Sequence, residues 1–273
     1  MTSLRLCDIS DDRLNVFTSL TNHQLRNALD PKKGIVVVES EIAIRVALEQ
    51  GLEPLSFLLS ERKLEAMEDV LCGLSDDVPV FVLPPEEVRK LTGYSVTRGA
   101  LCAMRRPQLP SVDELLRRAR NVVVLEGITD TSNVGAVFRN AAALGADAVI
   151  VAPTCADPLS RRAVRVSMGN VFKLMWTRAE GLWPQDVLDE LGRQGFVRLA
   201  LALADDAVSL RDAQEFGGER RALFFGSEGY GLSPAVLAAC DRSVIIPMHH
   251  GVDSLNVAAS SAVAMWELFA KET

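Results

Sequence analysis

The sequence predicts an α/β fold divided into two domains, and three observations support this. Short apolar and β-branched runs alternate with segments of helical periodicity along all 273 residues, which is typical of α/β architecture. A chain of this length usually folds around more than one core. A stretch with two prolines, 105–111, interrupts the alternation and is typical of a linker. We therefore expect a first domain at 1–105, a linker and connecting helix at 106–120, and a second domain at 121–273.

The elements of the first domain follow from short apolar runs that turn-forming residues separate. Periodic segments between these runs indicate helices that cover a sheet. The expected strands lie at 34–39, 55–60, 80–83 and 100–104, and the expected helices lie at 41–50, 62–71 and 85–91.

The second domain is expected to follow a polar amphipathic helix at 112–120. Its strands are short apolar runs that alternate with helical segments, which is typical of α/β architecture. The expected strands are 122–125, 148–151, 172–176, 197–202, 222–225 and 243–246, and the expected helices are 133–144, 158–167, 184–193 and a final Ala- and Ser-rich helix after Asn256.

Composition narrows the class of protein. Hydrophobic residues make up 48% and charged residues 24% of the chain, which is ordinary for a globular protein. No apolar stretch has the length of a membrane span, and the first residues lack a signal-peptide core. The five cysteines have no metal-ligand spacing, so we expect them to be reduced and structural. We therefore expect a cytoplasmic protein without a membrane partner or a metal.

Basic residues cluster at two places although the net charge is −7. Such clusters are usually solvated faces, but in an acidic protein they also indicate a local surface for a polyanion. From 89 to 120, eight basic residues (Arg89, Lys90, Arg98, Arg105, Arg106, Arg117, Arg118 and Arg120) stand against two acidic ones, and Arg161, Arg162 and Arg165 form a second cluster. We predict RNA contacts from Arg105, Arg106, Arg117, Arg118, Arg161, Arg162 and Arg165.

Three loops that follow apolar strands carry polar side chains at helix starts. After strand 122–125, Asn133 stands near a helix start, and Arg139 follows within an apolar helix. An arginine in such surroundings must reach the end of its helix or pair with an anion, because burying it alone is costly. It is therefore either a structural ion pair or a residue that meets a substrate.

The second and third loops also favour a ligand site. Gly226 opens a loop with three glycines that contains Glu228, and glycine allows close approach of the backbone to a ligand. Ser254 and Asn256 precede the final helix, where they can cap it and face the loop. The carboxyl ends of strands in open α/β sheets are where ligands bind.

Together these blocks resemble the SpoU, or TrmH-like, branch of the SPOUT RNA methyltransferases. The resemblance covers about 122–269 and rests on Asn133-x-Gly-x-x-x-Arg139, on Gly226-x-Glu228-Gly-x-Gly-Leu-Ser233, and on Ile246-Pro-Met with Ser254-Leu-Asn256. Thr131 and Ser227 depart from the residues common there. The first domain is similar, more loosely, to the ribosomal-protein-L30e-like RNA-binding domain, most clearly over 34–40.

The resemblance implies a parallel sheet with a deep trefoil knot, a homodimer, and S-adenosylmethionine as the cofactor. It implies transfer of a methyl group to a ribose 2′-hydroxyl, in rRNA more than in tRNA. By position, the cofactor is expected against Leu203, Gly226, Ile246, Met248, Leu255 and Asn256. Arg139 is the expected catalytic residue, oriented by Asn133 and Glu228, with Ser254 and Asn256 completing a polar wall.

Other roles stay open at the level of sequence. Arginine is a poor base because it stays protonated, so Arg139 can instead hold a phosphate and stabilise developing charge. Histidine is a common proton-transfer residue, but we expect His249 and His250 to be loop residues without that role. A catalytically inactive factor that binds S-adenosylmethionine or RNA is the main alternative. A nucleotide-binding oxidoreductase is disfavoured because the dinucleotide fingerprint is missing.

Overall fold

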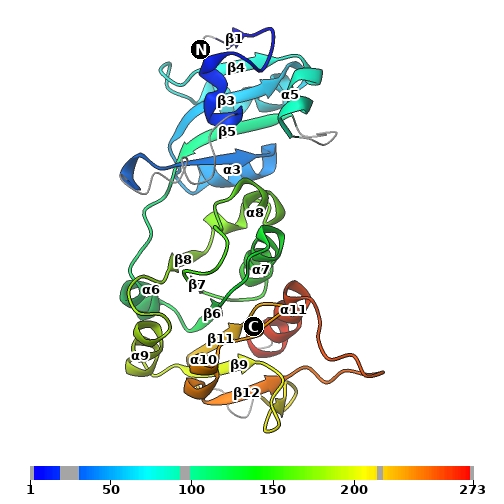
Figure 1. Ribbon diagram of the computed structural model, residues 1–273. Coiled ribbons are helices and arrows are strands. Elements are labelled where there is room, and N and C mark those ends of the chain that lie inside the picture. The colour runs from blue at the N-terminus through cyan, green and yellow to red at the C-terminus, as the bar shows by residue number, and fades with distance from the viewer. Residues whose placement is uncertain (1–2, 19–30, 93–98, 214–217, 271–273) are drawn as a thin grey trace. The chain divides into compact units, whose positions relative to one another are not determined.

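The computed structural model describes residues 3–18, 31–92, 99–213 and 218–270. The chain divides into two compact units. The first unit comprises Met1–Gln108 together with Leu159–Phe172, and the second comprises Leu109–Pro158 together with Lys173–Thr273. The segment 159–172, which the sequence places inside the second domain, thus packs with the first unit. Each unit contains one sheet (Figure 1).

The sheet of the first unit is mixed. Its strands, in spatial order, are β1 (Ser3–Arg5), β4 (Val80–Leu83), β3 (Pro54–Ser60), β5 (Ala100–Arg105) and β2 (Ile35–Glu39). β4 is parallel to both β1 and β3, whereas β5 is antiparallel to both β3 and β2. The strands expected from sequence are present, and β1 is an additional short edge strand. An apolar cluster that includes Phe17, Leu58 and Leu101 forms the core on one face.

The helices of the first unit are short. They are α1 (Asn15–Thr18), α3 (Glu41–Glu49), α4 (Glu68–Cys72), α5 (Pro85–Thr92) and α8 (Arg161–Val166), with 3-10 turns at Asp12–Leu14, Pro31–Lys33, Glu61–Lys63, Glu65–Met67 and Asn170–Phe172. The helix expected at 62–71 is broken into two 3-10 turns and α4. In these three elements only Met67 and Leu71 are buried, so no continuous apolar stripe holds a longer helix in place.

A buried carboxylate joins α8 to β2 within the first unit. Glu39 ends β2, and its side chain is 3% exposed. The Nε of Arg161 donates to Oε2 of Glu39 at 2.8 Å, and Nη1 of Arg165 donates to Oε1 at 3.2 Å. Each oxygen of the carboxylate therefore has its own guanidinium, which compensates its burial. Two of the three arginines in the second basic cluster thus neutralise Glu39, whereas Arg162 between them is exposed.

The sheet of the second unit is parallel throughout. Its strands, in spatial order, are β10 (Val208–Ser209), β12 (Arg242–Ile245), β9 (Val197–Leu201), β11 (Arg221–Phe225), β6 (Asn121–Leu125), β7 (Ala148–Val151) and β8 (Met175–Arg178). β8 begins three residues after the expected start at 172, because Phe172 closes a 3-10 turn by donating to the Gly169 carbonyl at 2.9 Å. β10 is too short for the sequence to predict.

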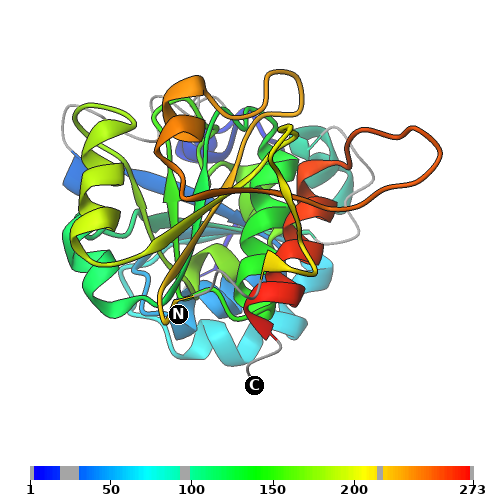
Figure 2. The same cartoon turned by 90° about the horizontal axis from the view of Figure 1, so that it is seen from below.

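Helices cover both faces of this sheet (Figure 2). Residues of α6 (Val112–Arg118), α9 (Gln185–Arg193) and α10 (Pro234–Ala239) pack on one face, where Val124 and Phe224 belong to the same apolar cluster. α7 (Thr131–Ala143) and α11 (Val257–Leu268) lie together on the other face. There Asn140 donates to the Ala258 carbonyl at 2.7 Å and to Oγ of Ser261 at 3.0 Å. The trefoil knot and the likeness of the first unit to L30e stay predictions of the resemblance.

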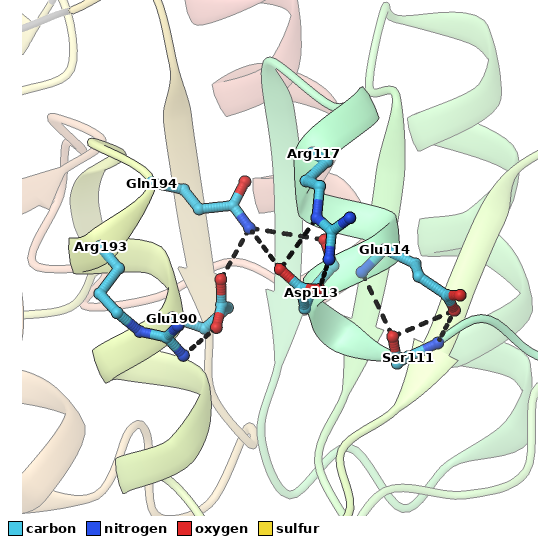
Figure 3. Close-up of polar contacts among 7 residues, drawn as sticks. All are labelled: Ser111, Asp113, Glu114, Arg117, Glu190, Arg193 and Gln194. Atoms are coloured by element: carbon cyan, nitrogen blue, oxygen red, sulfur yellow. Dashed lines mark hydrogen bonds and ion pairs between the residues drawn. The ribbon is translucent and has the colours of Figure 1, made fainter.

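Polar contacts join α6 to α9 (Figure 3). Ser111 and Glu114 form a capping box at the start of α6. Gln194, which follows α9, donates to Oδ1 of Asp113 at 3.4 Å and to Oε1 of Glu190 at 2.7 Å. Arg117 pairs with Asp113 one turn earlier on α6. This arginine, predicted to bind RNA, therefore has an acidic neighbour, in an exposed pair that contributes little to stability.

The Glu39 cluster predicts a difference between two adjacent arginines. Arg161→Gln should lower the free energy of unfolding by about 1–3 kcal/mol, because Glu39 then stays buried with one charged partner instead of two. Arg162→Gln is the matched control and should change it by less than about 0.5 kcal/mol, because its side chain is exposed. Urea unfolding measures both. Equal losses in the two variants would contradict a structural role for Arg161.

Candidate functional site

A cavity of about 620 Å³ opens at the carboxyl ends of β9, β11 and β12. Parallel strands bring their carboxyl ends to one edge of the sheet, so the loops after these strands meet there. The lining residues are Leu201, Ala202, Leu203, Phe225, Gly226, Ser227, Glu228, Tyr230, Gly231, Leu232, Leu237, Val244, Ile245, Ile246, Met248, Asp253, Ser254, Leu255, Asn256, Val257 and Ser260. The volume and the mixture of apolar side chains with a few polar groups are typical of a small-molecule site.

The residues predicted to contact a cofactor are all found around this cavity. Leu203 lies after β9, Gly226 after β11, and Ile246, Met248, Leu255 and Asn256 lie between β12 and α11. Of the predicted catalytic residues, Glu228, Ser254 and Asn256 also line it.

Gly226 is required by the close approach of two backbone segments. A Cβ built at this position would lie 2.2 Å from the Gly231 carbonyl carbon and 2.4 Å from the Leu232 nitrogen. The loop then closes on itself, since Ser227 and Gly231 exchange backbone hydrogen bonds of 3.1 and 2.9 Å. Any side chain at 226 would displace the backbone that shapes the cavity wall.

Glu126 anchors the far end of this loop, and sequence reasoning missed it. Its carboxylate is buried next to the end of β6. It accepts hydrogen bonds from the backbone nitrogen and Oγ of Ser233 at 2.7 and 2.9 Å, and from Nε1 of Trp183 at 2.7 Å. Ser233 in turn caps α10. Glu126 therefore fixes the position at which the 226–232 loop ends and α10 begins.

Three of the predicted catalytic side chains meet in one hydrogen-bonded cluster beside the cavity. Oε1 of Glu228 accepts from Nδ2 of Asn133 at 2.9 Å and from Nδ2 of Asn256 at 2.6 Å. Nδ2 of Asn256 also lies 3.2 Å from Oδ1 of Asn133. We call these residues the Asn133–Glu228–Asn256 cluster. It joins the loop after β11 to the first turns of two helices.

Local capping positions the two asparagines. Asp130 caps α7 by accepting from the Ser132 nitrogen at 2.6 Å, so Asn133 stands in the first turn. Asn256 is itself the N-cap of α11, and its Oδ1 accepts from the Ala258 nitrogen at 2.9 Å. Its amide nitrogen remains available and is turned toward Glu228. One side chain thus starts the helix and completes the cluster.

No hydrogen bond joins Arg139 to this cluster within the described residues. Arg139 is exposed on α7, six residues after Asn133, which in an ideal helix is about 9 Å along the axis and roughly 120° around it. Asn133 and Glu228 bind each other, and their role in orienting Arg139 stays a prediction.

The remaining predicted residues are placed as follows. Ser254 is exposed on the cavity wall, and His249 and His250 are exposed with ring centroids 6.3 Å apart. Arg105 lies 3.8 Å from the Glu53 carboxylate, Arg106 is half-buried, and Arg118 is exposed. Arg98 lies outside the described residues.

The described residues contain neither a metal-binding cluster nor a membrane-spanning helix. No group of three or more His, Cys, Asp or Glu side chains in them could hold a metal ion. No helix among them has the length and hydrophobicity to cross a membrane. Tyr230 and Ser260, which line the cavity, were also missed from the sequence, because neither type of residue is distinctive in a loop or in a small-residue helix.

Comparison with known proteins identifies the family. Residues 120–266, more than half of the chain, match the model of the SpoU rRNA Methylase family. An uncharacterised tRNA/rRNA methyltransferase of Mycobacterium bovis is 39% identical over 263 residues, covering 96% of this chain and 90% of that protein. A 23S rRNA (guanosine-2′-O-)-methyltransferase of Acinetobacter baylyi is 30% identical over 187 residues, covering 67% of this chain and 74% of that protein.

Among solved structures, an rRNA methyltransferase has a similar fold. The crystal structure of an AdoMet-bound rRNA methyltransferase from Sinorhizobium meliloti superposes with a TM-score of 0.80, covers 97% of each chain and is 20% identical. At that identity the likeness concerns the fold. The family match and the curated relatives show that the chain belongs to the SpoU rRNA methylase family and is an RNA methyltransferase.

Proposed function

We propose that this protein transfers a methyl group from S-adenosylmethionine to a ribose 2′-hydroxyl of RNA, in rRNA rather than tRNA. The observation that carries the proposal is the Asn133–Glu228–Asn256 cluster, which sets a carboxylate at the rim of a ligand-sized cavity. The Acinetobacter baylyi relative, which is named for 2′-O-methylation of guanosine in 23S rRNA, supports the choice of hydroxyl and of RNA.

The cavity fits S-adenosylmethionine in size and chemistry. Leu203, Ile246, Met248 and Leu255 offer apolar surface for the adenine faces, and backbone groups of the same loops can bind its polar edge. The close backbone contact at Gly226 leaves no room for a side chain in the wall. When bound, the cofactor supplies an electrophilic methyl group on a sulfonium. The protein must then align the acceptor oxygen with it.

Glu228 is suited to hold the acceptor hydroxyl. Both amide donors bind its Oε1, and in the described part of the chain no group bonds the other oxygen, Oε2. A fixed carboxylate oxygen facing solvent at the rim can accept the hydrogen of a ribose hydroxyl and thereby increase its nucleophilicity. The two asparagines keep this carboxylate in place, so they are positioning residues.

Arg139 is suited to hold a phosphate of the RNA backbone. Its exposed guanidinium carries a permanent positive charge and is planar, so it can bind two phosphate oxygens at once. In this role it does not need Asn133 or Glu228 as partners. RNA contacts are a further prediction for Arg105, Arg106, Arg118 and Arg162, and together with the first unit these arginines favour a large RNA. A cytoplasmic location and a homodimer also remain predictions.

The position of the methyl group tests the proposal directly. Protein, ribosomal RNA and S-adenosylmethionine with a tritiated methyl group should yield labelled RNA that digests to a 2′-O-methylnucleoside. Transfer RNA should accept less label. Label on a base would refute the proposed acceptor. Thermal stabilisation by S-adenosylmethionine without any transfer to RNA would instead identify a catalytically inactive binding factor.

Substitutions at two glycines of one loop should differ in their effect on cofactor affinity. Gly226→Ala should weaken binding of S-adenosylmethionine at least about tenfold, because the new Cβ would force the 231–232 backbone into a new position. Gly229→Ala is the matched control and should bind normally, since nothing lies within 4 Å of its Cβ position. Isothermal titration calorimetry measures both affinities. Unchanged affinity in Gly226→Ala would place the cofactor elsewhere.

Substitutions of Arg139 and of the two histidines should differ in their effect on the rate of methyl transfer. Arg139→Ala should slow methyl transfer by about two orders of magnitude or more, roughly 3 kcal/mol, while S-adenosylmethionine still binds. Arg139→Lys should restore little, because a point charge does not reproduce the planar fork. His249→Ala and His250→Ala should stay largely active. Inactive histidine variants beside a normal Arg139→Ala would show that an imidazole base performs the proton transfer.

A further inference from the structure

Tyr230 has an exposed aromatic ring at the rim of the cavity. It is 97% exposed, the highest value among the large apolar side chains of the described residues. It also lines the cavity and stands two residues from Glu228. A ring left in water does not gain the stabilisation that burial provides, and at the rim of the cavity it is available to a ligand.

The loop that carries Tyr230 is held by hydrogen bonds. Ser227 and Gly231 bond to each other through both backbone groups, at 3.1 and 2.9 Å. Oγ of Ser227 accepts from the Tyr230 nitrogen at 3.1 Å. The backbone of Tyr230 is therefore positioned by the turn.

Two glycines, Gly229 and Gly231, flank Tyr230, so the residues next to it in the chain carry no side chains. Gly231 has a φ of 68°, which favours glycine and lets the turn close. Because the Tyr230 ring is 97% exposed, a flat group can approach it without displacing protein atoms.

We propose that Tyr230 is a stacking platform for a base of the RNA, at or next to the nucleotide whose ribose is methylated. The inference rests on the proposed function, because it places that ribose at Glu228. RNA-binding proteins commonly stack unpaired bases on aromatic side chains, and a ring beside the acceptor carboxylate positions the nucleotide without selecting its sequence. It follows that the substrate presents an unstacked nucleotide, as in a loop or bulge, and that a continuous duplex is a poor ligand at this site.

Binding of RNA can test this without methyl transfer. The probe is a single-stranded oligoribonucleotide that contains 2-aminopurine, whose fluorescence is quenched on stacking, and the same oligonucleotide annealed to its complement serves for comparison. Tyr230→Ala should weaken binding of the single strand about fivefold to a hundredfold and remove the protein-dependent quenching. Tyr230→Phe should retain both, because stacking needs the ring and not the hydroxyl.

The controls separate stacking from other roles. Leu182→Ala removes another exposed apolar side chain, 74% exposed and outside the cavity lining, and should bind RNA normally. Leu182→Ala should also keep its affinity for S-adenosylmethionine, and the mass in solution should be unchanged in every variant. Equal weakening of single strand and duplex, no weakening in Tyr230→Ala, or a changed mass that indicates a subunit contact would each overturn the proposal. RNA binding is measured without methyl transfer. A failure of the proposed ribose methylation can therefore be distinguished from a failure of base stacking.

Discussion

A single carboxylate oxygen joins three distant parts of the chain. Oε1 of Glu228 binds amides that lie 95 residues before it and 28 residues after it. Hydrogen bonds to a charged acceptor stabilise more than neutral ones, by about 1.5–3 kcal/mol each. Both amides also stand at helix N-termini, where the helix dipoles favour a negative charge. The charge of Glu228 therefore fixes where α7 and α11 begin relative to the loop after β11.

The parallel sheet makes this junction possible. β9, β11 and β12 are neighbours, and their carboxyl ends release the loops that form the cavity. The wall between β11 and α10 is narrow, since Gly226 contacts the backbone of Gly231 and Leu232, and Glu126 binds Ser233 at the start of α10. The polar cluster and the cavity thus share one loop. A displacement of the loop backbone, as expected for a side chain at Gly226, should affect cofactor and RNA together.

Much of the sheet and of the site could be predicted from the sequence, because local patterns specify them. Apolar runs such as 80–83 and 148–151 correspond to β4 and β7, and the polar residues that follow the strands lie at one edge, as parallel strands require. Asn133, Glu228 and Asn256 could be expected to meet for this reason. Tyr230 could not be singled out, since exposure depends on how the turn closes.

Long-range pairing explains most of what the sequence did not reveal. Arg161 and Arg165 resemble a basic surface cluster in the sequence, yet they bind Glu39, more than 120 residues earlier in the chain. Within the described residues, Asn133 and Glu228 bind each other, and no hydrogen bond joins either of them to Arg139. No local pattern shows which acidic residue an arginine will find. Such partners depend on the packing of whole elements.

We propose that Asn133 and Glu228 act as one unit in methyl transfer. A double-mutant cycle with Asn133→Ala, Glu228→Ala and the double variant, measured as single-turnover rates with saturating S-adenosylmethionine and ribosomal RNA, tests this coupling. If Asn133 acts through that carboxylate, the double variant should be no more than about twofold slower than Glu228→Ala alone. Losses that multiply, so that the double variant is slower by the product of the two single effects, would show that the two residues act independently.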